Sequence, residues 1–96
     1  MKILAIEKEM PGIEAIDFQP HLKAEATRVW ELYQEGIIRE LYFRQDQHTA
    51  VLLLECSDIE QAKEAMATLP LVRASLIHFE LIALAPYSGF ARLFVS

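Results

Sequence analysis

Two residues near the C-terminal end of the chain have the types and the spacing needed to exchange a proton with a ligand. His78 and Glu80 stand at positions i and i+2 of an apolar run, 76–83, that has the composition of a β-strand. Alternate side chains of a strand share a face, so these two lie on the same side. A carboxylate beside an imidazole raises the pKa of the imidazole and can form a general acid/base pair near neutral pH. The alternative is a buried polar pair that serves an interface between subunits.

Tyr42 and Arg44 alternate along a second apolar run and are candidates for binding a substrate. The guanidinium offers a planar fork and the phenol a single donor, which together suit a carboxylate or enolate oxygen. The alternative for Arg44 is an ion pair at an interface, with Glu40 or Glu80 as its partner.

The histidines at 21, 48 and 78 show none of the short spacings typical of metal ligands, so we expect no metal and no cofactor. His21 stands at the start of a predicted helix, where the dipole favours the neutral ring. It can act as a ligand or base at the mouth of a cleft, or be only a solvated cap. His48 falls in a predicted hairpin turn and should be exposed. Cys56 is the only cysteine and is read as a buried structural thiol.

The 96 residues make one domain, with 53% apolar residues and a net charge of −5. The acidic balance argues against a nucleic-acid partner, which requires clustered Lys and Arg. A single cysteine excludes an internal disulfide and favours a reducing compartment, so we expect a cytoplasmic protein. No apolar run approaches the ~20 residues of a membrane span, and no membrane partner is expected. An apolar excess in so short a chain favours self-association.

The order of elements predicts an α+β fold of the ferredoxin-like βαββαβ kind, a four-stranded antiparallel sheet with two helices on one face. The predicted strands are 2–8, 37–44, 50–56 and 76–83. The first helix begins near His21 and ends at Gly36 in a left-handed cap. The second opens with a capping box, Ser57 to Glu60, and Pro70 ends it or lies just beyond it. The stretch 9–20 contains Pro11 and Gly12 and reads as a long loop that packs over something or serves as a lid.

The alternation within the strands predicts which face of the sheet each side chain occupies. The helix-facing residues should be Leu41, Phe43, Ile77, Phe79 and Leu81. The opposite face should carry Glu40, Tyr42, Arg44, His78 and Glu80. The third strand is apolar on both faces, from Val51 to Leu54. We therefore expect the second face to be covered by the sheet of a partner copy, with a cleft where the polar residues point inward.

The C-terminal tail, 86–96, concentrates aromatic area after Pro86. Its large apolar residues are Tyr87, Phe90, Leu93 and Phe94. An unattached tail of this kind would be an exposed apolar patch, so we expect it to dock on its own sheet edge or across a dimer. Arg92 would travel with the tail and can close a pocket from above.

The segments Gly36–Tyr42, Leu69-Pro70-Leu71 and a strand closing on Pro86 resemble the muconolactone isomerase family. That family belongs to the dimeric α/β-barrel group, which also includes YCII-related proteins and small monooxygenases. The resemblance covers residues 36–86 without a gap. It implies two sheets packed back to back, sometimes in larger rings, and a cofactor-free isomerisation. It assigns no catalytic residue here.

These observations predict a homodimer that binds a small organic molecule. As an enzyme it would be an isomerase or lyase that works by proton transfer, with His78 and Glu80 as the catalytic pair. Its substrate-binding residues would be Tyr42, Arg44, His21 and Arg92. The alternative is a non-enzymatic dimer that binds a small ligand or only assembles.

Overall fold

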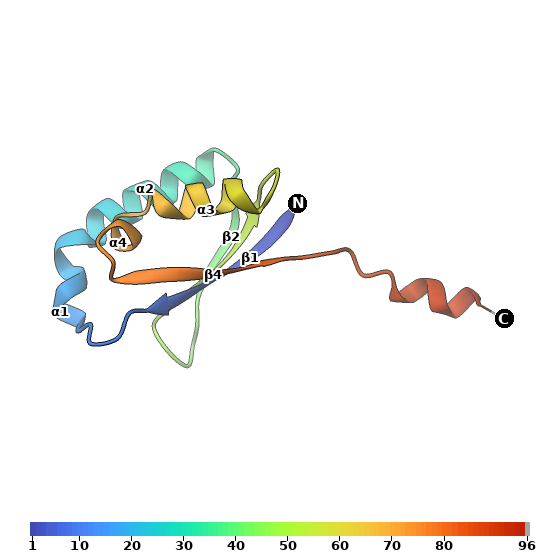
Figure 1. Ribbon diagram of the computed structural model, residues 1–96, viewed down its shortest axis with the longest axis horizontal. Coiled ribbons are helices and arrows are strands. Elements are labelled where there is room, and N and C mark those ends of the chain that lie inside the picture. The colour runs from blue at the N-terminus through green and yellow to red at the C-terminus, as the bar shows by residue number, and fades with distance from the viewer. Residues whose placement is uncertain (96) are drawn as a thin grey trace.

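The computed structural model describes residues 1–95 as one antiparallel sheet with helices on one face (Figure 1). The strands are β1 (Lys2–Glu9), β2 (Ile38–Phe43), β3 (Ala50–Glu55) and β4 (Ile77–Ala83). Their order across the sheet is β2-β3-β1-β4, and every neighbouring pair is antiparallel. This is the predicted α+β, ferredoxin-like arrangement, with β2 and β4 at the two edges.

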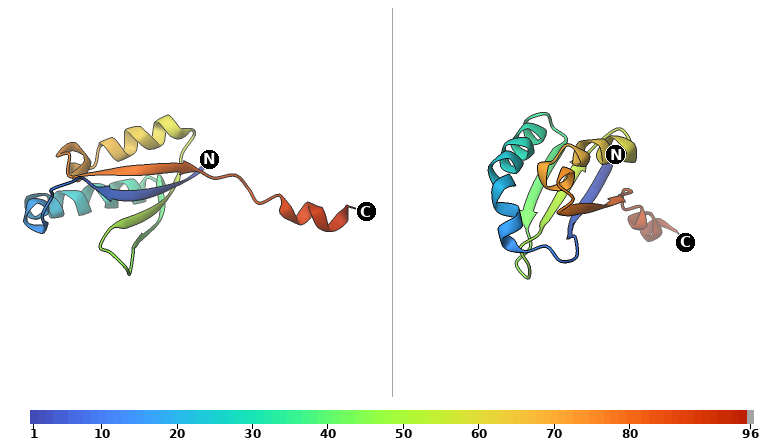
Figure 2. Two further views of the ribbon diagram at one scale, coloured as in Figure 1. Left: turned by 60° about the horizontal axis from the view of Figure 1, so that its bottom comes forward. Right: turned by 60° about the vertical axis from the view of Figure 1, so that its left-hand side comes forward.

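Two longer helices, α2 (Leu22–Gln34) and α3 (Ile59–Ala67), cover the same face of the sheet (Figure 2). The connection from β1 to α2, residues 10–21, contains a short helix, α1 (Ala15–Phe18), and a 3-10 turn, Gln19–His21. The last α-helix, α4 (Pro70–Arg73), is also short, and it begins at Pro70 because proline suits the first helical position. None of the helices within residues 1–95 has the length and apolar character needed to cross a membrane.

The sequence predicted two helix caps, one after α2 at Gly36 and one before α3 at Ser57, and the structure confirms the first. Gly36 has φ +82°, which confirms the left-handed cap after α2. The capping box at Ser57 is wrong by one residue. Asp58 is the N-cap of α3, and its carboxylate accepts from the Gln61 backbone N–H at 2.8 Å. The backbone N–H of Ser57 donates to the Gln61 side chain at 2.6 Å. The helix side chain therefore bonds the residue before the N-cap rather than the N-cap itself.

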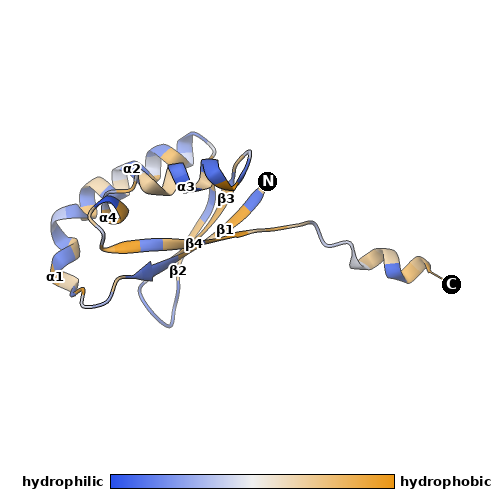
Figure 3. Ribbon diagram, viewed as in Figure 1, coloured by the Kyte–Doolittle hydropathy of each residue, from blue (hydrophilic) through white to orange (hydrophobic). Residues whose placement is uncertain are grey.

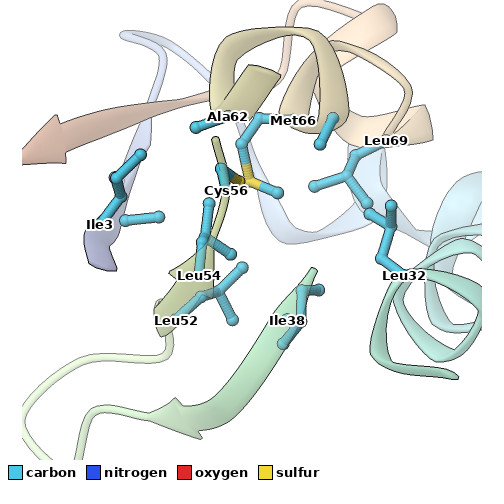
Figure 4. Packing of buried hydrophobic residues seen from close by; sticks show 11 residues of the cluster. Ile3, Leu32, Ile38, Leu52, Leu54, Cys56, Ala62, Met66 and Leu69 are labelled. Atoms are coloured by element: carbon cyan, nitrogen blue, oxygen red, sulfur yellow. The ribbon is translucent and has the colours of Figure 1, made fainter. Parts of the chain in front are cut away.

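The hydrophobic core lies between the sheet and the two long helices (Figure 4). Its five largest fully buried side chains are Ile3, Leu32, Ile38, Leu54 and Leu69. Across the sheet, Ile3 pairs with Leu54, and Ala5 pairs with both Leu52 and Leu81. The register therefore confirms the predicted helix-facing parity of the strands.

The opposite side of the sheet, called here the open face, is also largely apolar. Its central residues are Leu4, Ile6, Val51, Leu53 and Ile82. The first four are half-buried by neighbouring strands alone, and Ile82 is 39% exposed. The solvated face of an antiparallel sheet usually carries polar side chains. The apolar open face therefore has the composition of a sheet face that is covered by protein.

After β4 the chain leaves the domain (Figure 1). The Leu84 N–H still donates to the Lys2 carbonyl at 2.9 Å. Beyond it the tail runs outward to a 3-10 turn, Gly89–Phe94, and it contributes to a long axis of 60 Å against 29 and 20 Å. The tail is mostly hydrophobic (Figure 3), with Phe94 86% exposed. It does not dock on its own sheet edge; docking across a dimer stays a prediction, and Ser96 lies outside the described residues.

Candidate functional site

A cavity of about 940 Å³ lies between α2 and the sheet, on the helix-covered side. Its apolar walls include Leu22 and Val29 from α2, Leu41, Phe43 and Leu52 from the strands, and Phe79 from β4. Cavities of roughly 300–1,000 Å³ with apolar walls and few polar groups are typical of small-molecule sites.

The cavity exists because α2 does not close onto the edge strand β2. Leu41 and Phe43 face the helix side, as predicted, yet they remain 45% and 64% exposed. On the facing side, Trp30 and Tyr33 stack with ring centroids 5.8 Å apart and also line the cavity. Apolar walls on both sides of an unfilled space favour occupation by an apolar ring.

Glu7 is the carboxyl that β1 places in this cavity. It has the same parity as Ile3 and Ala5, so it points to the helix-covered side. Its Oε1 accepts a hydrogen bond from the Ala50 N–H at 3.2 Å. Burial raises the pKa of Glu7 above its ordinary value, and the charges of Glu9 and Glu25 act in the same direction. The Ala50 bond and the charge of His48 oppose this rise but do not cancel it.

Glu25, on α2, is a second carboxyl in the cavity wall. Its Oε1 accepts from the Leu71 N–H at 2.9 Å, which ties α2 to the start of α4. Burial raises the pKa of Glu25, while the Leu71 bond and the charge of His21 lower it by less. The cavity therefore holds two carboxyls that retain a proton to higher pH than an exposed glutamate.

His48, from the β2–β3 hairpin, is the imidazole of the cavity wall. Its ring stacks on Phe43 with centroids 4.4 Å apart and planes at 22°. The ring is exposed, as expected for a turn, yet the stacking holds it against the cavity. Two carboxyls and an imidazole that line one cavity are the kinds of group that act in general acid/base catalysis.

The structure brings one of the predicted site residues, Tyr42, to the cavity rim. Its hydroxyl donates to Glu40 at 2.8 Å, and this bond raises the pKa of the phenol. Arg44 lies beyond the end of β2 and forms a two-pronged pair with Asp46, with Nε to Oδ1 at 2.8 Å. Neither Glu40 nor Glu80 is its partner, so the interfacial ion pair considered for Arg44 does not form within the chain.

His78 and Glu80 lie on the open face, away from the cavity, as their parity predicted. Both are exposed, and the Glu80 carboxylate is 3.7 Å from the Lys8 ammonium. The cleft expected around them requires a second copy, so their catalytic role stays a prediction. Arg92 lies in the projecting tail, and His21 is half-buried next to α2 without lining the cavity.

Sequence reasoning missed Glu7, Glu25 and His48 as members of one site. Glu7 carried a usable signal, because a carboxylate on the buried parity of a central strand requires an explanation. Glu25 and His48 carried none, since only the fold brings α2 and the hairpin to β1. Among residues 1–95, no group of three or more His, Cys, Asp or Glu side chains is arranged to hold a metal ion.

No protein-family model and no curated protein matches the sequence. Among solved structures, the chain is similar to 5-chloro-2-hydroxyhydroquinone dehydrochlorinase from Burkholderia phenoliruptrix, determined in complex with 2,5-dihydroxybenzoquinone. The TM-score is 0.66 at 15% sequence identity, over 93% of this chain and 98% of the other. The two proteins therefore share their fold over nearly their whole lengths.

Proposed function

We propose that this protein binds a small organic molecule in the cavity between α2 and the sheet and catalyses a cofactor-free proton transfer on it. The reaction class is isomerisation or elimination. The observation that carries the proposal is Glu7, a carboxyl of raised pKa set in the wall of an apolar cavity. A base whose pKa lies closer to neutral transfers protons in both directions more effectively than an ordinary glutamate.

The chemistry can be written from these groups alone. The Glu7 carboxylate removes a proton from a carbon next to a carbonyl, and the electron pair moves onto the carbonyl oxygen. A ring N–H of His48 donates a hydrogen bond to that oxygen as its charge grows. In an isomerisation the protonated Glu7 returns the proton to a different carbon. In an elimination the leaving group departs with its bonding electrons, and Glu7 later releases the proton to water.

Two likenesses support this class of reaction. The structural neighbour is a dehydrochlorinase, and its complex contains a six-membered quinone ring. The resemblance of residues 36–86 to muconolactone isomerase also implies proton-transfer chemistry without a cofactor. The cavity walls offer the flat aromatic and aliphatic surfaces that a ring of this size would contact.

We further propose that the protein is a homodimer, formed through the open faces of two sheets. Burying Leu4, Ile6, Val51 and Leu53 would remove a contiguous apolar surface from water, which is the ordinary driving force for such a contact. His78 and Glu80 would then lie in or beside the interface. We expect the dimer to act in the cytoplasm, because its single cysteine is free.

Glu7→Gln tests the proposal, with Glu64→Gln as the matched control. Glu64 is exposed on α3, away from the cavity. The assay incubates the protein in D2O with hydroxylated quinols, their chlorinated derivatives and unsaturated lactones. It follows carbon-bound deuterium, isomer formation and chloride release.

We expect the reaction rate in this assay to fall by about 10²-fold or more in Glu7→Gln, which is the usual contribution of a general base. Glu64→Gln should leave the rate unchanged. Equal rates in the wild type and Glu7→Gln would contradict the assignment of Glu7. Ligand binding without turnover would instead support the non-enzymatic module.

A further inference from the structure

The charged groups that line the cavity are Glu7, Glu25 and His48, and within residues 1–95 no lysine or arginine lines it. Other basic side chains do not supply a cation to its wall: His21 lies next to α2 without lining the cavity, Arg44 is paired with Asp46, and Lys8 lies on the open face beside Glu80. When both carboxyls are ionised, the cavity wall therefore holds two negative charges and no lysine or arginine to balance them.

The absence of lysine and arginine from the described cavity wall disfavours a negatively charged ligand. An anion placed among these walls would lose its hydration and would face two carboxyls rather than a cation, and such a placement is strongly unfavourable. Sites that take up carboxylates or phosphates normally supply an arginine fork or a cluster of backbone N–H groups. Here the backbone N–H groups of Ala50 and Leu71, two residues that line the cavity, already donate to Glu7 and Glu25.

We propose that the substrate is an uncharged ring compound, a neutral phenol, enone or lactone without a carboxylate or phosphate. This deepens the proposed function and rests on it. The carbonyl or hydroxyl of such a molecule can accept a hydrogen bond from the His48 ring. Its flat faces can pack against Trp30, Tyr33 and Phe43, which line the cavity as large exposed rings.

A pair of probes of equal shape and different charge tests the inference. 2,5-Dihydroxybenzamide and 2,5-dihydroxybenzoate share a ring and both hydroxyls, and only the second is an anion at neutral pH. Calorimetry at low ionic strength measures both affinities, followed by further amide and acid pairs on other small rings. We expect the amides to bind at least about tenfold more tightly. The double variant Glu7→Gln, Glu25→Gln should shrink this ratio, because it removes the negative charge and keeps the shape.

The possible outcomes separate this inference from the function on which it rests. Equal binding, or tighter binding of the acids, would overturn the inference and leave a ligand-binding cavity in place. If the acids bind more tightly and Arg92→Gln removes their advantage, the tail of a second copy brings a cation to the cavity. Binding of neither member of any pair would contradict the proposed function itself.

Discussion

Glu25 connects two walls of the cavity through one hydrogen bond, so its removal should weaken the fold by a predictable amount. Glu25→Ala leaves the Leu71 N–H without its acceptor at 2.9 Å, and an unsatisfied backbone donor costs about 1–3 kcal/mol. The variant also removes a carboxylate whose burial is unfavourable, which offsets part of this loss. We therefore expect a net destabilisation of about 1–2 kcal/mol. In a domain of this size that corresponds to a fall in Tm of roughly 4–16 °C.

Thermal unfolding followed by circular dichroism measures this change, and Glu64→Ala is the control. Both substitutions exchange a helical glutamate for alanine, but Glu64 is exposed and no described residue bonds its side chain. The control should stay within about 0.5 kcal/mol of the wild type. Equal Tm values for Glu25→Ala and Glu64→Ala would refute the role given to the Leu71 bond.

The contribution of Glu25 to the stability of the fold depends on pH. The pKa of Glu25 is higher in the folded chain than its ordinary value of 4.5, so ionisation costs stability. Below the ordinary value the carboxyl is protonated in both states, and no such cost exists. As pH rises from there through the raised folded pKa, the wild type should lose stability relative to Glu25→Gln. The difference should then level off. A difference that stays constant with pH would contradict the burial argument.

Three further changes test the fold and the site. Leu54→Ala removes a fully buried side chain and should cost about 2–5 kcal/mol in urea unfolding; a smaller loss would mean that the core is misassigned. Leu53→Asp, on the open face, should keep the circular dichroism spectrum and shift sedimentation at micromolar concentration from dimer to monomer; a monomeric wild type would contradict the dimer. His48→Gln should reduce turnover by about 10²-fold with little change in Tm, since the ring is exposed, and full activity would remove His48 from the mechanism.

The strand faces could be predicted because alternation is a local property. In β4, Ile77, Phe79 and Leu81 share one parity and His78 and Glu80 the other, and the observed register agrees. The cap of α3 failed because Ser57 and Asp58 are both good N-caps, and only the backbone conformation of Asp58, φ −158° and ψ 177°, distinguishes them.

The cavity could not be predicted from the same patterns. It depends on a separation of α2 from β2 that no local signal encodes, and on contacts across 43 and 46 residues of chain, from Ala50 to Glu7 and from Leu71 to Glu25. Parity reasoning drew attention to polar residues of the open face. The informative residue was Glu7, a carboxylate among apolar neighbours on the covered side.

Ligand contacts to Leu52 and Leu53 decide whether a ligand binds in the cavity or on the open face. These neighbours on β3 point to opposite sides of the sheet, Leu52 into the cavity and Leu53 onto the open face. The measurement uses protein with labelled leucine methyl groups and records nuclear Overhauser effects to bound 2,5-dihydroxybenzamide. We expect effects to the methyl groups of Leu52 and Leu41 and none to those of Leu53. Effects to Leu53 without any to Leu52 would place the ligand on the open face with His78 and contradict the cavity as the binding site.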